Sequence, residues 1–295
     1  MSACGIRFLS GDCRAILPTL PADSFDCIVT SPPYWGLRDY GVEDQIGLEP
    51  TLDAYVETLV NVGDDLWRVL KPEGTFWLNL GDSYAANGNT AHSARKKSVP
   101  YGLKPKDLCG VPWRVAFALQ SRGWWLRSAI VWHKKNPMPE PVTDRPTSAY
   151  EMVFLLTKSE RYFYDADAIA EAAVHPGVRI STAYGNAGTG RGSTTDCGAN
   201  AKETRNARNV WTISSQPFSG SHFATMPPDL AERCIKAGCP KSGTVLDPFG
   251  GAGTTGLVAD RLGRSATLIE LNPAYRDMSV DRIEADAGFF AEIVK

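Results

Sequence analysis

The residues TSPPYW, 30–35, place two prolines and two aromatic side chains directly after the apolar run 25–29. The prolines offer no N–H group, and a residue that precedes a proline is held extended, so the Ser31 and Pro32 carbonyls are fixed as acceptors. The Ser31 hydroxyl is another acceptor, and Tyr34 offers a flat ring for stacking. This set suits a planar aromatic amine. Acceptors for both of its N–H groups favour a pyramidal nitrogen, whose localised lone pair can attack a methyl sulfonium directly. The candidate catalytic residues are therefore Ser31, Pro32, Pro33 and Tyr34.

A second chemical motif, VLDPFGGAGTTG at 245–256, reads as a strand, a glycine-rich turn and the start of a helix. It contains Gly251-x-Gly253-x-x-Gly256, and Glu270 ends the next strand 19 positions after Gly251. In such motifs the glycines let a ligand approach the backbone, and the acid binds ribose hydroxyls. Asp247 is poorly matched to the pyrophosphate of NAD but suits the amino group of an amino acid. The motif thus favours S-adenosylmethionine, which carries an amino group, a sulfonium, a ribose and an adenine but no phosphate. NAD stays as the alternative.

The elements that position these motifs alternate between strands and helices. Strands are expected at 6–10, 25–30, 75–80, 126–132, 151–157, 243–247 and 266–271, and helices at 52–70, 111–120, 227–238, from 254 and from 273. Strands separated by helices predict an α/β fold whose mostly parallel sheet is covered on both faces. Ligands of such sheets bind at the carboxyl ends of the strands, so the two motifs can face each other. Most strands precede the glycine loop, which requires a permuted chain order.

Charge is distributed unevenly along the 295 residues. Residues 1–83 carry a net charge of −8, whereas residues 84–146 carry +8 and residues 174–212 carry +3. Two polar, glycine-rich stretches, 85–108 and 174–209, fall in the basic middle and are too polar to pack as core. Clustered Lys and Arg neutralise phosphates, so both stretches are candidate nucleic-acid contacts.

Several functional classes are disfavoured by composition. The seven cysteines have no CxxC pair, which argues against a zinc site or a disulfide framework and favours a reducing cytosol. The four histidines show no ligand spacing, so no metal is expected. No apolar run approaches the roughly 18 residues of a membrane span, so no membrane association is expected.

Taken together, the motifs resemble those of the amino-group DNA methyltransferases of the permuted order. TSPPY resembles the catalytic tetrapeptide, DPFGGAGTT the cofactor loop, and HFATMPPDLAERCI (222–235) the helix segment that closes over the methionine part. LSGDC (9–13) and IELNPAYRDMSVDRI (269–283) are similar to two further cofactor-binding segments. The closing segment has Met226-Pro227 where the family often has Phe-Pro. The resemblance implies a Rossmann-like S-adenosylmethionine-dependent methyltransferase fold, with a mixed, mostly parallel sheet of about seven strands, circular permutation and inserted target-recognition loops.

The resemblance also implies how the chain is divided and which residues form the site. Residues 1–173 form the catalytic half, with a basic insertion at 85–108; residues 174–210 form the target-recognition region; and residues 211–295 form the cofactor-binding half. The Ser31 hydroxyl and the Pro32 carbonyl hold the amine of a flipped-out base, on which Tyr34 stacks. Asp247 holds the methionine amino group, Glu270 the ribose and Asp12 the adenine amine. The cofactor site as a whole comprises Asp12, Asp247, Pro248, Phe249, Gly251, Gly253, Thr254, Glu270 and Asn272. DNA contacts are expected from Arg95, Lys96, Lys97, Arg179, Arg191, Arg205 and Arg208.

The expected activity is site-specific methylation of double-stranded DNA. A serine at the first motif position favours cytosine N4, and adenine N6 by the same mechanism is the alternative. Carbon-5 methylation is disfavoured because the chain has no Pro-Cys dipeptide. An NAD-dependent oxidoreductase and a non-catalytic nucleic-acid-binding module are the more distant alternatives. The protein is expected in the cytoplasm and is expected to be encoded by a bacterium, an archaeon or a phage. A separate restriction endonuclease and a homodimer are left open as partners.

Overall fold

The computed structural model describes residues 5–37, 39–85, 100, 102–173, 203–216, 225–287 and 292–294. The chain divides into two compact units, Met1–Asp165 with Asn209–Lys295, and Ala166–Arg208. The second unit contains a short 3-10 helix, η2 (Asp167–Ile169), and the antiparallel pair β6 (Glu171–Ala172) and β7 (Thr204–Arg205). The division at 173 and 210 stays a prediction, because most of residues 174–210 lie outside the described residues.

The first unit is built on one nine-stranded sheet, whose strand order is β11-β1-β10-β9-β2-β3-β5-β4-β8. Every neighbouring pair in it is parallel except the two pairs that involve β5. The strands are β1 (Gly5–Ser10), β2 (Phe25–Thr30), β3 (Leu70–Leu80), β4 (Trp125–Lys134), β5 (Tyr150–Thr157), β8 (Val210–Ile213), β9 (Thr244–Asp247), β10 (Ser265–Glu270) and β11 (Glu292–Val294). The expected mostly parallel sheet is confirmed. Its two additional members, β8 and β11, are short edge strands that were not predicted.

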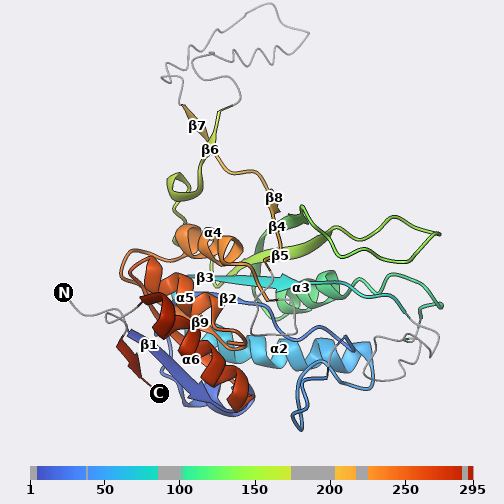
Figure 1. Ribbon diagram of the computed structural model, residues 1–295, viewed down its shortest axis with the longest axis horizontal. Helices are drawn as coiled ribbons and strands as arrows, with labels where there is room; N and C mark the ends of the chain where they lie inside the picture. Colours follow the sequence, from blue (N-terminus) through green and yellow to red (C-terminus); the bar gives the residue numbers. More distant parts are fainter. Residues whose placement is uncertain are drawn as a thin grey trace, which may run out of the picture. The chain divides into compact units, whose positions relative to one another are not determined.

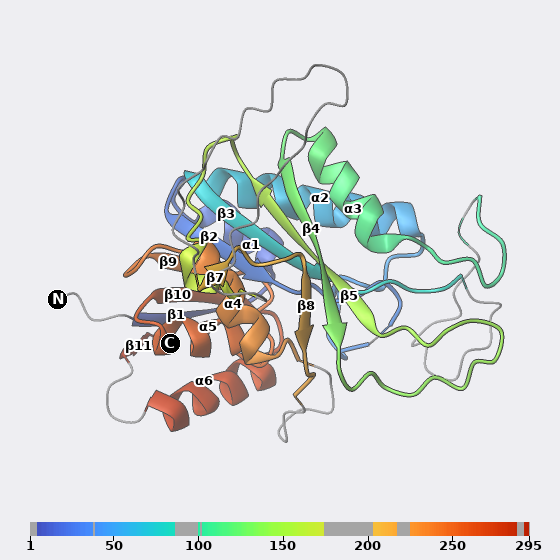
Figure 2. The ribbon, with the colours of Figure 1, turned by 90° about the horizontal axis from the view of Figure 1, so that it is seen from above.

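Helices cover both faces of this sheet, with α2 and α3 on one side and α4, α5 and α6 on the other (Figure 2). Their bounds are α1 (Cys13–Ile16), α2 (Leu52–Val69), α3 (Val111–Ser121), α4 (Pro228–Gly238), α5 (Thr254–Arg261) and α6 (Pro273–Ala287), with the 3-10 helix η1 (Leu17–Thr19) after α1. The five longer helices match the expected ones, whereas α1 and η1 were not predicted. None of the helices among the described residues is long and apolar enough to cross a membrane.

Strand β3 shows how its side chains build the core on both faces. Phe76 and Leu78 belong to the cluster packed against α2 and α3. Trp77 points to the opposite face, where a Cβ atom on Gly238 of α4 would lie 2.2 Å from its Nε1 atom. This alternation follows from the two-residue period of a strand. The absence of a side chain at Gly238 therefore allows α4 to lie directly on the sheet.

The chain order of the sheet is permuted, as the sequence predicted. Strand β9, which leads into the glycine loop, comes late in the chain but lies beside β2 in the middle of the sheet (Figure 1), with β10 on its other side (Figure 2). Cys27 and Ile28 of β2 pair with Val245 and Leu246 of β9 in parallel. The turn after β2 and the turn after β9 therefore leave the same edge of the sheet from neighbouring strands.

Candidate active site at the carboxyl ends of the strands

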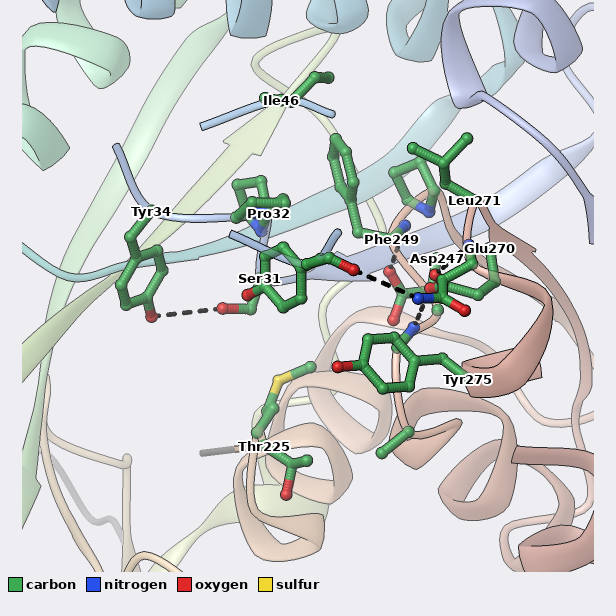
Figure 3. A pocket seen from close by; sticks show the side chains of 18 of the residues that line it. Ser31, Pro32, Tyr34, Ile46, Thr225, Asp247, Phe249, Glu270, Leu271 and Tyr275 are labelled. Carbon is green, nitrogen blue, oxygen red and sulfur yellow. Dashed lines mark hydrogen bonds between the residues drawn. The ribbon is translucent and has the colours of Figure 1, made fainter. Parts of the chain in front are cut away.

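A cavity of about 400 Å³ lies where these two turns meet. Its lining combines the turn after β2, the glycine loop after β9, the segment after β10 and the residues before α4, as Figure 3 shows. The four candidate catalytic residues line it, as do eight of the nine candidate cofactor residues. Gly253 is the exception. Its Cα faces Ser279 of α6, where an added Cβ would lie 2.9 Å from the Ser279 Cβ, so Gly253 serves packing of the loop.

The SPPY turn is held from behind by core residues. The Tyr55 hydroxyl donates to the Pro33 carbonyl at 2.8 Å, and Gly47 packs against the Pro33 ring, where a Cβ would lie 3.2 Å from the Pro33 Cβ. Trp35 is 4% exposed and donates through Nε1 to the Glu49 carbonyl at 3.1 Å. Trp35 therefore packs under the turn, which leaves Ser31, Pro32 and Tyr34 toward the cavity.

Polar groups that the sequence did not reveal complete the catalytic side of the cavity. The Tyr34 hydroxyl donates to Oε2 of Glu151 at 2.5 Å and lies 3.3 Å from Oγ of Ser31. Lys134 donates through Nζ to Oε1 of Glu151 at 2.5 Å, and Asn79 Nδ2 donates to Oε2 at 3.1 Å. Burial, and then the Glu151 carboxylate, raise the pKa of Tyr34 well above its ordinary value, so the phenol keeps its proton.

The direction of one strand explains why Glu151 and Lys134 were missed. Glu151 stands near the start of β5, and the start of a strand would lie far from the site in an all-parallel sheet. Because β5 runs antiparallel to β3 and β4, its first residues lie at the edge where β3 and β4 end. Lys134, the last residue of β4, meets Glu151 there. A signal that β5 is reversed was absent from its apolar sequence.

Asp247 is the most strongly perturbed acid of the cavity. It is 3% exposed, and its carboxylate accepts hydrogen bonds from Thr30 Oγ1 at 2.5 Å, Thr255 Oγ1 at 2.7 Å and the Phe249 N–H at 3.0 Å. Burial raises the pKa of Asp247 to about 7, although these donors oppose the shift. A cationic group in the cavity would favour the ionised carboxylate, whereas a phosphate would be repelled.

Glu270 ties the glycine loop to the segment before α6. Its two carboxylate oxygens accept from the Gly251 N–H at 2.7 Å and the Asn272 N–H at 2.8 Å. Burial raises the pKa of Glu270 above its ordinary value. Asn272 in turn accepts from the Ala274 N–H through Oδ1 at 2.9 Å, at the start of α6. The carboxylate keeps lone pairs that can accept from hydroxyl groups in the cavity.

The rest of the cavity wall on the side of the candidate cofactor residues consists of one further acid, Asp12, and of apolar and aromatic groups. Asp12 accepts from the Arg14 N–H at 2.8 Å and forms a salt bridge with its guanidinium. The rings of Tyr40 and Tyr275 meet edge to face with centroids 6.2 Å apart. Lining residues outside the predicted set include Cys13, Tyr40, Ile46, Thr225, Met226, Leu271 and Tyr275. The presence of Met226 in this lining agrees with the expected closing segment.

S-adenosylmethionine fits this set of groups. Three carboxylates (Asp12, Asp247 and Glu270) can accept from an amino group, ribose hydroxyls and the adenine amine, and apolar side chains such as Ile46 and Leu271 can flank an adenine ring. The turn at Gly251, which has a φ of +49°, brings backbone rather than side chain to the cavity. The acids also leave the site poorly suited to NAD, because a pyrophosphate would face a buried carboxylate.

Asp82 and Trp124, which both follow predicted elements, have structural roles in the fold. Asp82 accepts from the N–H groups of Ser83 and Val111 through Oδ1, at 2.8 and 2.9 Å, and so caps the start of α3. Trp124 is 2% exposed and packs in the core, whereas its neighbour Trp125 is 45% exposed.

The candidate DNA contacts are described only in part. Arg95, Lys96, Lys97, Arg179 and Arg191 lie outside the described residues. Arg205 and Arg208 belong to the second unit, where both guanidinium groups pair with Glu171, at 3.4 and 3.0 Å. Their assignment to DNA binding stays a prediction.

The fold and the site define a Rossmann-like S-adenosylmethionine-dependent methyltransferase. Comparison with known proteins then gives the family. A family model of N6 and N4 methyltransferases, described as "DNA methylase", matches residues 25–281, and the chain belongs to this family. It methylates an exocyclic amino group of a base in DNA, with S-adenosylmethionine as the methyl donor.

Individual relatives support this assignment. The chain is 43% identical over 292 residues to the type II methyltransferase M.Cfr9I of Citrobacter freundii, covering 96% of this chain and 89% of the relative. It is 44% identical over 287 residues to the type II methyltransferase M.SmaI of Serratia marcescens, covering 94% and 90%.

Solved structures share the fold. The PvuII DNA methyltransferase, described as cytosine-N4-specific, superposes with a TM-score of 0.68 at 21% identity, covering 95% of this chain and 86% of that one. A putative DNA modification methylase from Thermus thermophilus, complexed with S-adenosyl-L-methionine, has a TM-score of 0.62 at 21% identity, covering 99% and 100%.

Proposed function

We propose that the protein methylates cytosine at N4, as the modification enzyme of a type II restriction-modification system. The observation that carries the base assignment is Ser31 at the first position of the catalytic motif, where it lines the cavity beside Tyr34. The name of the PvuII enzyme agrees with this choice, although its likeness to this chain is one of fold. Adenine N6 is the second candidate, because its amine presents the same two N–H groups.

The cavity supports a division of roles between the two motifs. Bound S-adenosylmethionine supplies a methyl group activated by a positively charged sulfur. The Ser31 hydroxyl and the Pro32 carbonyl accept the two N–H groups of the target amine, and the Tyr34 ring stacks on the extruded base. Asp247 accepts from the methionine amino group. Glu270 and Asp12 accept from the ribose hydroxyls and the adenine amine, on the side that Tyr275 and Leu271 line.

The base assignment is tested with product analysis. The protein is incubated with labelled S-adenosylmethionine and unmethylated genomic DNA, and the digested nucleosides are identified by mass spectrometry. N4-methylcytosine is expected. N6-methyladenine would overturn the base assignment and keep the methyl-transfer chemistry, whereas unmethylated DNA after confirmed cofactor binding would contradict the enzymatic function itself.

We infer the partner and the compartment of the enzyme from the names of its relatives, which are type II methyltransferases. A separate endonuclease that cuts the same unmodified site is the proposed partner, and the cytoplasm, where DNA and cofactor meet, is the proposed compartment.

Residues 174–210 and the basic insertion 85–108 are the proposed DNA-contacting segments. Sedimentation with and without DNA distinguishes a homodimer from a monomer. Sequencing of methylated DNA gives the recognition site.

A further inference from the structure

Four side chains form one hydrogen-bonded chain along the catalytic side of the cavity. Lys134 Nζ donates to Oε1 of Glu151, and the Tyr34 hydroxyl lies against Oε2, each at 2.5 Å. The Ser31 hydroxyl follows, 3.3 Å from the Tyr34 oxygen. The side chain of Glu151 is 13% exposed and that of Lys134 is 24% exposed, so the pair is largely removed from water. The charges at one end of this chain can therefore act on the hydroxyl at the other.

The chemistry of the groups fixes the direction of each bond. An ammonium can only donate a hydrogen bond and an ionised carboxylate can only accept one, so Tyr34 must be the donor in its hydrogen bond to Glu151. Tyr34 also lies 3.3 Å from Oδ1 of Asn79, but its single proton goes to the shorter, charge-assisted bond. Asn79 instead donates its own amide N–H to Oε2 of Glu151. The Tyr34 oxygen is thereby left as an acceptor.

This direction decides what Ser31 presents to the target base. A serine hydroxyl carries one proton and two lone pairs and can face an amine with either. If its proton is given to Tyr34, its lone pairs face the cavity and can accept an N–H group of the amine. If Tyr34 were to donate to Ser31 instead, the serine proton would oppose the N–H groups of the base.

We propose that Glu151 and Lys134 are positioning residues, which orient the Tyr34 and Ser31 hydroxyls so that Ser31 acts as an acceptor for the target amine. The positive charge that develops on the amine nitrogen during methylation then meets the negative ends of two aligned O–H dipoles. Neither residue belongs to the SPPY motif or to the glycine loop. The inference holds for cytosine and adenine alike, so it does not depend on the proposed base.

Glu151→Gln tests this direction with almost no change in shape. The Lys134 ammonium donates to the amide oxygen of the new glutamine, so the NH₂ group of that glutamine turns toward Tyr34. The direction of the hydrogen bonds between Tyr34 and Ser31 is then reversed. We expect the single-turnover methylation rate at saturating DNA to fall at least tenfold. The dissociation constants for S-adenosylmethionine and DNA are expected to stay within twofold. The matched control is Glu57→Gln, which removes the charge of a carboxylate on α2 that pairs with Arg122 at 3.2 Å.

A second substitution separates orientation from mere packing. With Lys134→Met added to Glu151→Gln, no ammonium holds the amide oxygen, which can turn to accept from Tyr34. We expect the single-turnover rate of this double variant to be at least threefold higher than that of Glu151→Gln. A purely structural role of the pair would not produce this result. A Glu151→Gln rate within twofold of the unmodified enzyme, or a further loss on adding Lys134→Met, overturns the proposal.

Tyr34→Phe provides an independent measurement if Glu151→Gln does not fold. It keeps the stacking ring and removes the hydroxyl that links Glu151 to Ser31. The expected result is again a slower single-turnover rate with unchanged binding of DNA and cofactor. A Tyr34→Phe enzyme as fast as the unmodified one contradicts the proposed chain.

Discussion

Thr30 donates a 2.5 Å hydrogen bond to Oδ1 of Asp247, although the two residues are 217 positions apart. Thr30 ends β2 and leads directly into the SPPY turn, and Asp247 ends β9 and leads directly into the glycine loop. Both side chains are buried. The bond therefore joins the SPPY turn, the proposed base-binding motif, to the glycine loop, the proposed cofactor-binding motif, at the point where both leave the sheet.

Thr30→Val tests the contribution of this bond to folding. Valine has nearly the same shape, but it leaves Asp247 without one of its side-chain donors. We expect a loss of about 1–3 kcal/mol in the free energy of unfolding, the usual cost of leaving a buried polar group without a hydrogen-bond partner. Urea unfolding measures it. Thr58→Val is the control, because the Thr58 hydroxyl bonds the Ala54 carbonyl of its own helix. Equal stability of both variants would contradict the expectation.

The raised pKa of Asp247 predicts how stability and cofactor binding depend on pH. In the unfolded chain this acid ionises near its ordinary value of 3.8, whereas in the folded protein its pKa is about 7. Between these values the folded state binds more protons, so the contribution of Asp247 to stability falls as pH rises from about 4 to about 7 and is then constant. Asp247→Asn should make the decline of stability with pH shallower, as followed by urea unfolding across the range, and the raised pKa of Glu270 accounts for part of what remains.

The same group should release its proton when a cation binds. Because the amino group of S-adenosylmethionine favours the ionised carboxylate, its affinity should rise as pH increases from about 5.5 to 7, with proton release on binding. Calorimetry in buffers of different ionisation enthalpy measures both. Asp247→Asn should bind more weakly and without this pH dependence. An affinity that is independent of pH in the unmodified enzyme would contradict the role assigned to Asp247.

A side chain at Gly253 should disturb the glycine loop through packing. The backbone of Gly253 has a φ of +72°, and an added Cβ would lie 2.9 Å from the Ser279 Cβ. Gly253→Ala is expected to shift the loop or α6 and to weaken S-adenosylmethionine binding at least tenfold. Gly263→Ala is the matched control: its φ is +67°, but nothing lies within 4 Å of the added atom. The control should lose about 1–2 kcal/mol of stability, the cost of the left-handed backbone alone. Equal cofactor affinity in both variants would refute the packing role.

Arg208 provides a test of the target-recognition region. Its side chain is 66% exposed and lies 3.0 Å from the Glu171 carboxylate, so the guanidinium is at the surface of the second unit even while it is paired. Arg208→Gln should weaken DNA binding and reduce the slope of log affinity against log salt by about 1, if the residue contacts a phosphate. Arg122→Gln, which removes a surface cation of the first unit, is the control. A slope unchanged by Arg208→Gln would exclude this contact.

The two motifs could be predicted from the sequence because their chemistry is local. The prolines beside Ser31 and the glycines after Asp247 restrict the backbone within a few residues, and the apolar runs before them identify strands. The rule that ligands bind at the carboxyl ends of parallel strands then brings the motifs together. The structure confirms this reasoning in the Thr30–Asp247 bond, which neither motif reveals when read alone.

The missed part of the site depends on tertiary pairing. Glu151 and Lys134 reach the cavity only because β5 is reversed, and the apolar sequence of β5 suits either direction. The roles of Asp82 as a cap and of Trp35 as core likewise depend on partners outside their own strand or turn, Val111 and Glu49. The edge strands β8 and β11 were missed because they are short. β11 adds only three residues to the edge of the sheet, beside β1.

A substitution at Gly81 should slow catalysis and leave cofactor binding unchanged. It follows β3, and an added Cβ would lie 2.6 Å from Cε2 and 3.0 Å from Cδ2 of the Tyr34 ring. Gly81→Ala should therefore push the Tyr34 ring out of the position from which we propose that it stacks on the base. Since a displacement of about 1 Å at a reacting centre can cost about a hundredfold in rate, we expect a single-turnover rate at least tenfold slower. The affinity for S-adenosylmethionine should be unchanged, because Gly81 does not line the cavity.

The cause of this loss can be isolated with a double-mutant cycle. Gly81→Ala should lower the free energy of unfolding in the unmodified enzyme but not in Tyr34→Ala, where the ring that the new methyl group meets is gone. Gly263→Ala, with nothing within 4 Å of its added atom, controls for the substitution itself and should keep the full methylation rate. If Gly81→Ala is equally destabilising with and without the Tyr34 ring, the contact between these two residues does not hold Tyr34 in its catalytic position.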